Sequence, residues 1–110
     1  MSIRAALLDL HRALVEEERR EHEKTLGRLS GGEFLQALIS DPVFAWLRPL
    51  TTLIVRLEEL GDAPDADLSA AARALFSEES EFRRRSAALV QRSPDVAFAY
   101  AAARRAVNTP

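Results

Sequence analysis

The chain has 110 residues, of which 47% are hydrophobic and 29% charged, and its formal net charge at pH 7 is −2. This length predicts a single domain, residues 1–110, with enough material for one hydrophobic core. There is no cysteine, which excludes disulfides and thiolate metal sites, and no stretch approaches the ~20 apolar residues of a membrane span.

The first predicted helix begins after Ser2, a good N-cap residue, and runs to about Leu26. Asp9 interrupts its apolar start, so no export signal is expected and the predicted location is the cytoplasm, without membrane attachment. Apolar residues repeat along its first half at the four-three-four spacing of one helical face: Ile3, Leu7, Leu10 and Leu14. The second half lacks such a face. It should therefore extend into solvent or place its polar face against another surface.

A short helix over residues 31–39 is predicted next. Ser30 and Glu33 have the spacing of a capping box, in which each side chain bonds to the other residue's backbone. Asp41 and Pro42 should end this helix, because the residue before a proline disfavours helical torsion angles. The same pair is also a good start for the following helix, as N-cap and first helical residue.

The helix over residues 42–60 is expected to be the axis of the fold, ending at Gly61. Its apolar residues cover about 220° of a helical wheel, far more than a surface helix needs. Pro49 cannot donate a backbone hydrogen bond, so a kink is expected there. The apolar residues of this helix are Val43, Phe44, Trp46, Leu47, Leu50, Leu53, Ile54, Val55, Leu57 and Leu60.

Three further helices complete the prediction. The first, residues 68–76, is expected to have Asp67 as its cap, and the second should begin at Ser77 and run to about residue 91. Ser93 and the proline that follows it predict the start of the last helix, which runs to about residue 107. No segment has the features of a strand. The predicted fold class is all-α, a compact bundle of five to six helices around a long, kinked central helix.

Residues 7–20 and residues 30–60 are similar to segments of a group of small bacterial all-helical proteins of unknown function. The most specific part is Phe-Ala-Trp-Leu-Arg-Pro-Leu at residues 44–50, and the similarity extends to Arg-Ser-Pro-Asp-Val at 92–96. The resemblance implies an independent helical domain. It implies no known activity, so no catalytic or binding residue is carried over.

Residues capable of catalysis or metal binding are few. There is no cysteine nucleophile and no Gly-x-Ser-x-Gly elbow, and both histidines, His11 and His22, lie in the first helix. Glu18 and His22 are four residues apart and could share one metal ion, although the Glu-x-x-His motif of di-metal bundles is absent. The interpretation that we favour is a protein without enzymatic activity or cofactor, in which these two residues form a solvated face or a contact with another helix. A small-ligand or metal site is the third alternative.

The C-terminal part of the chain is basic. Residues 83–110 contain six arginines and one acid, whereas residues 56–82 contain eight acids and two arginines. Pairing between these segments, within the domain or across a subunit contact, is the favoured interpretation. A surface that binds an anion or nucleic acid is the second alternative, and its candidate contacts are Arg83, Arg84, Arg85, Arg104 and Arg105.

The wide apolar arc of residues 42–60 raises the question of what covers it. Phe44, Trp46 and Arg48 are residue types that often anchor interfaces. They could complete the monomer core, or they could form the contact with a partner. The functional prediction is an interaction module that pairs with a second copy of itself or with another protein.

Overall fold

The computed structural model describes residues 2–28, 30–61 and 63–108, and within these ranges it contains helices and no strands. The predicted all-α class is confirmed. The elements are α1 (Ile3–Leu26), α2 (Gly31–Ser40), the 3₁₀ helix η1 (Pro42–Leu47), α3 (Arg48–Glu59), α4 (Ala66–Leu75), α5 (Glu81–Arg92) and α6 (Pro94–Asn108).

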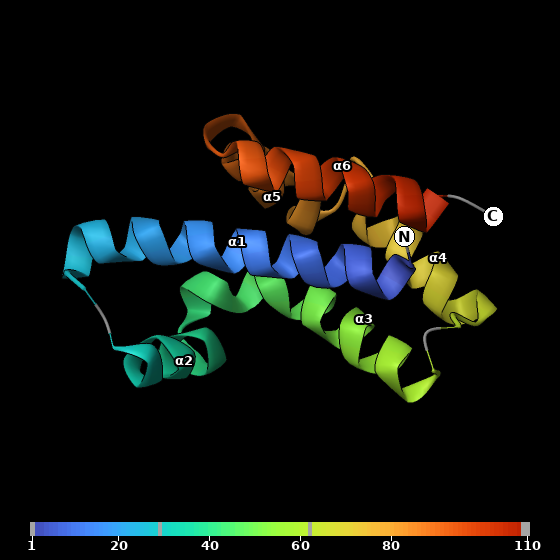
Figure 1. Cartoon of the computed structure of the whole chain (residues 1–110), viewed down its shortest axis with the longest axis horizontal. Helices are drawn as coiled ribbons and strands as arrows, with labels where there is room; N and C mark the ends of the chain where they lie inside the picture. The colour runs from blue at the N-terminus through green and yellow to red at the C-terminus, as the bar shows by residue number, and fades with distance from the viewer. Residues whose placement is uncertain (1, 29, 62, 109–110) are drawn as a thin grey trace.

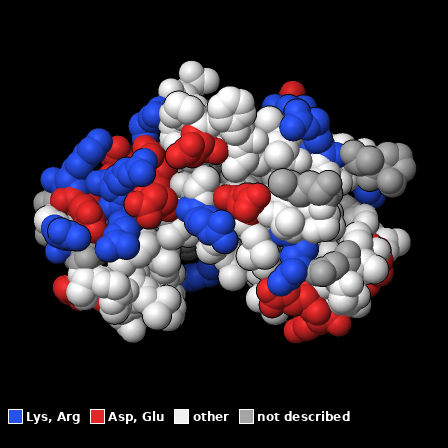
Figure 2. All heavy atoms as spheres, in the orientation of Figure 1, with Lys and Arg blue, Asp and Glu red and all other residues white. Residues whose placement is uncertain are grey.

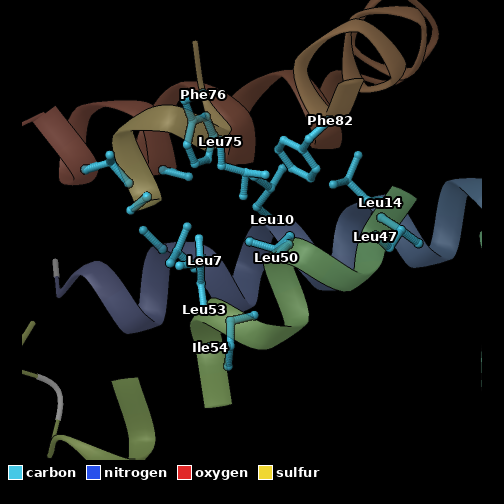
Figure 3. Packing of buried hydrophobic residues seen from close by; sticks show 14 of the residues in the cluster. Leu7, Leu10, Leu14, Leu47, Leu50, Leu53, Ile54, Leu75, Phe76 and Phe82 are labelled. Carbon is cyan, nitrogen blue, oxygen red and sulfur yellow. The ribbon is translucent and has the colours of Figure 1, made fainter. Parts of the chain in front are cut away.

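Helix α1 is the longest element, and most of the others are arranged around it. Helices α6 and α3 run antiparallel to α1 on two sides of it, while α2 lies at one end of the molecule (Figure 1). The predicted apolar stripe of α1 is confirmed, because Leu7, Leu10 and Leu14 are completely buried. These leucines meet side chains of η1, α3, α4 and α5 in one continuous core (Figure 3).

The segment predicted as one kinked helix over residues 42–60 is divided into η1 and α3. The Asp41 carboxylate accepts a hydrogen bond from the Val43 backbone N–H at 3.0 Å, as the predicted cap requires. The chain then winds as a 3₁₀ helix and changes to an α-helix between Leu47 and Arg48. Pro49 lies in the first turn of α3, where its missing N–H has no intrahelical partner to lose. The change of helix type falls next to Pro49, the residue at which a kink was expected.

The apolar arc of this segment is narrower than the sequence suggested. Val43, Val55 and Leu60 are each more than 40% exposed. A 3₁₀ helix has three residues per turn instead of 3.6, so a wheel drawn for one continuous α-helix misplaces the residues of η1. The apolar residues that are buried are Phe44, Trp46, Leu47, Leu50, Leu53, Ile54 and Leu57.

Two predicted helix starts were wrong by two or three residues. Helix α4 is capped by Asp65, whose carboxylate accepts from the Leu68 N–H at 2.8 Å, and not by Asp67. Helix α5 is capped by Ser80 and not by Ser77, because residues 77–80 form a turn that closes α4 first. The start of α6 matches its prediction, with the Ser93 hydroxyl accepting from the Val96 N–H at 3.2 Å.

Among the described residues, no single helix is long and apolar enough to cross a bilayer. Only α2 together with residues 42–59, two pieces bent by 75°, has a suitable length and composition.

Candidate functional site

Helix α2 packs on η1 and on the polar second half of α1. The ring of Phe34 in α2 meets Phe44 edge-on, with 5.7 Å between the ring centroids, and His22 lies 5.5 Å from Phe44 on the other side. The Arg19 guanidinium lies 5.3 Å from the centre of the Phe34 ring, a cation–π geometry. Of the two alternatives left open for this half of α1, contact with another surface is therefore the one observed.

A group of ionic contacts joins the same half of α1 to α5. Glu17 is 8% exposed, and one of its oxygens accepts from Arg92 Nε at 3.2 Å while the other lies 3.5 Å from Arg20. Arg92 also lies 4.0 Å from Glu18 and 3.7 Å from Glu21. Arg92 of the basic segment thus forms ion pairs with α1. The pairing of the basic segment with residues 56–82, within the domain or across a subunit contact, stays a prediction.

Glu18 and His22, the candidate metal ligands, have other contacts. Burial raises the pKa of Glu18, and the positive charge of Arg92 and a hydrogen bond with Trp46 oppose that rise. His22 packs on the Phe44 ring. In the part of the chain that the structure describes, no three His, Asp or Glu side chains are close enough together to hold a metal ion.

The candidate anion-binding arginines lie in different environments and do not share one set of contacts. Arg83 donates to the Phe76 carbonyl at 3.2 Å and Arg84 to the Glu79 carbonyl at 2.6 Å, so both hold the turn between α4 and α5. Arg83 and Arg104 also lie close enough to Tyr100 to oppose the rise that burial causes in its pKa. Arg85 and Arg105 are exposed. Arg85 lies on another side of α5, where its positive charge opposes the rise that burial causes in the pKa of Glu18.

The candidate interface residues separate into core and surface. Phe44 and Trp46 are 1% and 6% exposed, and the Trp46 ring lies 5.7 Å from Phe82 of α5. They complete the core of the monomer, which was one of the two alternatives. Arg48 is exposed, and its guanidinium donates to the Ile39 carbonyl at the end of α2 at 3.0 Å.

The outward face of α2 is an apolar surface that the sequence analysis did not single out. Leu35 and Ile39 are 58% and 61% exposed, and they lie one turn apart on the side opposite Phe34. Gly32 and Gln36 share this side, which therefore carries no charge. Figure 2 shows uncharged surface over α2, next to the mixed charges of the end of α1. The four-residue spacing of Leu35 and Ile39 was visible in the sequence, but the sequence did not show which side of the helix faces the core.

A cleft of about 430 Å³ lies beside α2, between it and the start of α3. His11 Nε2 lies 3.1 Å from the Thr51 hydroxyl, which in turn donates to the Leu47 carbonyl at 3.3 Å. Burial lowers the pKa of His11, so its ring is neutral at pH 7. The cleft is lined by His11, Leu38, Ile39, Phe44, Leu47, Arg48, Thr51 and Thr52.

Further clefts lie elsewhere among the described residues. One of about 510 Å³ lies between α1 and α6, beside Phe98, which is 75% exposed. Its charged lining includes Asp9, Arg12 and Asp95, and Arg12 lies 3.7 Å from Asp9. Another, about 660 Å³, lies between α3 and the α4–α5 corner, with Arg56 and Glu81 among its lining residues.

No family model, curated protein or solved structure matches the chain. The similarity of residues 7–20 and 30–60 to small bacterial helical proteins of unknown function stays a prediction.

Proposed function

We propose that the chain is a non-enzymatic helical interaction module that forms a homodimer in the cytoplasm through the outward face of α2. The observation that carries this proposal is the exposure of Leu35 and Ile39 on a helix whose opposite side is already packed. Large apolar side chains grouped on one exposed face are typical of interaction sites. Val43, 49% exposed, extends the apolar surface from α2 into η1.

A second copy of the chain fits this face because the face is uncharged and complementary to itself. A two-fold axis places identical surfaces in contact, so a charge near the axis would approach its own copy. The outward side of α2 carries none. Two such helices can therefore pair without like-charge repulsion and without removing an ion from water.

The positions of Gly32 and Ile39 favour an antiparallel pair. They lie seven residues apart, about 10 Å along the axis, with Leu35 and Gln36 midway between them. In an antiparallel pair centred on that midpoint, Ile39 of each copy meets Gly32 of the other. Apart from its chain neighbours and the backbone of its own helix, no described atom lies within 4 Å of a Cβ built on Gly32, so that position has space for a partner's side chain.

The oligomeric state tests the proposal. We expect the wild-type chain to sediment as a concentration-dependent dimer in the micromolar range, because a pair of ten-residue helices buries a small area. The double variant Leu35→Gln, Ile39→Gln should dissociate at a concentration at least tenfold higher, with unchanged helix content by circular dichroism. Phe98→Gln, which removes the most exposed aromatic ring from a different face, is the matched control and should leave the dimer intact.

Two results would contradict the proposal. One is a wild-type monomer at several hundred micromolar. The other is a dimer that the Phe98 variant dissociates and the α2 variant does not. Binding of a monomeric wild-type chain to lipid vesicles, lost in the α2 variant, would assign the same face to a membrane surface instead.

A further inference from the structure

The cleft between α2 and α3 has the composition of a binding site for a small amphipathic molecule. Its apolar walls come from two elements, with Leu38 and Ile39 contributed by α2 and with Phe44 and Leu47 contributed by η1. Its volume of about 430 Å³ lies at the small end of the range for ligand sites, about 300–1,000 Å³. Apolar walls with a few polar groups at one end are the usual arrangement in such sites.

Arg48 supplies a positive charge to the lining of this cleft that no described carboxylate neutralises. Its guanidinium donates to the Ile39 carbonyl, and no described Asp or Glu forms an ion pair with it. The cleft lining itself contains no acid. A guanidinium has five N–H donors in a planar fork, so the single bond to Ile39 leaves donors that can hold both oxygens of a carboxylate.

His11 and Thr51 add neutral polar groups beside that charge. The Thr51 hydroxyl lies within hydrogen-bond distance of both His11 Nε2, at 3.1 Å, and the Leu47 carbonyl, at 3.3 Å. Burial lowers the pKa of His11, which disfavours a second positive charge in the cleft. One cation in an apolar cleft selects a ligand with one negative charge.

The α1–α6 cleft and the cleft at the α4–α5 corner lack this combination. The α1–α6 cleft contains three acids, and Arg12 there is paired with Asp9. The cleft at the α4–α5 corner contains Glu81 as well as Arg56, so its charges are balanced.

We infer that the α2–α3 cleft binds a small monocarboxylate with an aliphatic tail, whose carboxylate pairs with Arg48 and whose tail lies between α2 and η1. The carboxylate adds charge-assisted hydrogen bonds, and the tail covers the apolar walls. Ile39 belongs both to this cleft and to the proposed dimer face, but the other seven lining residues lie outside that face and Leu35 does not line the cleft.

Chemical-shift titration of the ¹⁵N-labelled full-length chain tests the inference, with hexanoate as the probe. Backbone signals of residues 38–39, 47–48 and 51–52 should shift together and saturate. Hexanoate should bind about tenfold more tightly than 1-hexanol, which has the same tail without the charge, because one charge-assisted contact contributes about this factor. Acetate, which lacks the tail, should bind at least tenfold more weakly than hexanoate.

Variants assign the contact to Arg48. Arg48→Gln should weaken hexanoate binding about tenfold and leave 1-hexanol binding unchanged. Arg56→Gln is the matched control, because it removes an arginine of α3 from a different cleft, and it should have no effect. Equal affinities for hexanoate and 1-hexanol, shifts that map to either other cleft, or an Arg48 variant with wild-type affinity would each overturn the inference. The spectrum of each variant shows directly whether it is folded.

Discussion

Replacing Arg92 with methionine removes the ionic link between α1 and α5 while keeping an unbranched side chain of similar length. Arg92 touches Glu17, Glu18 and Glu21, and the shortest contact, 3.2 Å to Glu17, is made to a side chain that is only 10% exposed. Without Arg92, Glu17 keeps one cationic neighbour, Arg20 at 3.5 Å. In the variant, the nearly buried Glu17 carboxylate therefore keeps only one of its two cationic neighbours.

The expected loss lies between two limits. Breaking a fully buried ion pair destabilises a protein by about 3–5 kcal/mol, and breaking an exposed pair changes stability by about 0–1 kcal/mol. The Arg92 side chain is 39% exposed and Glu17 keeps Arg20, so we expect a loss of about 1.5 kcal/mol. For a domain of this size, that lowers the thermal midpoint by about 6–12 °C.

Thermal and urea unfolding, followed by circular dichroism, measure the effect. The control is Arg12→Met, which breaks an exposed pair with Asp9 at 3.7 Å and should change stability by less than about 0.5 kcal/mol. The combined variant Glu17→Gln, Arg92→Met should be less destabilised than the sum of the two single changes. If Arg92→Met behaves like Arg12→Met, Glu17 is adequately solvated without Arg92 and the reasoning from burial fails.

Three further predictions follow from other buried or docked groups. Ser86→Ala should raise stability by about 1 kcal/mol in urea unfolding, because the Ser86 hydroxyl is fully buried without a hydrogen-bond partner among the described residues; a loss of stability would show that the hydroxyl is bonded. Phe34→Ala should remove about 3 kcal/mol of packing that is local to α2, so amides 31–40 should exchange hydrogen faster while those of α6 do not; equal acceleration in both helices would contradict this. The pKa of His11 is lower in the folded chain than its usual 6.5 because the ring is buried, so the unfolded chain binds more protons below that value and stability should fall as the pH drops from 7 towards 5. In denaturant titrations at pH 7 and pH 5, His11→Gln should show a smaller fall in stability between the two pH values than the wild-type chain. A fall as large as in the wild type would show that other groups cause the pH dependence.

Local sequence signals were sufficient to predict most of the helices. The leucine stripe of α1, the capping box at Ser30 and Glu33 and the Ser93 cap are formed by residues within one or two turns of each other. The prediction of a helix start failed where two neighbouring residues were equally suitable as the N-cap. Asp65 and Asp67 are equally good caps, and the choice depends on which start lets Leu68 reach the core.

Features that depend on distant contacts could not be predicted. The 3₁₀ helix η1, in which Phe44 packs on Phe34 of α2 and Trp46 packs on Phe82 of α5, is not recorded by any periodic pattern in the sequence. Glu17 and Arg92 are 75 residues apart in the chain. The exposure of Leu35 and Ile39 follows from the contact between Phe34 and Phe44, because that contact decides which side of α2 turns inward.

The division of aromatic residues by η1 determines what optical spectroscopy can detect in this chain. Phe44 packs on the α2 side with Phe34, whereas Trp46 packs against Phe82 of α5. Trp46 is the only tryptophan, so the intrinsic fluorescence reports the environment of α5 and not that of α2. Heating that releases α2 first should therefore lower the helical signal while the emission maximum stays constant. A melting curve followed by fluorescence alone would then give the midpoint for unfolding around Trp46. It would not detect the unfolding of α2, which carries the proposed dimer face.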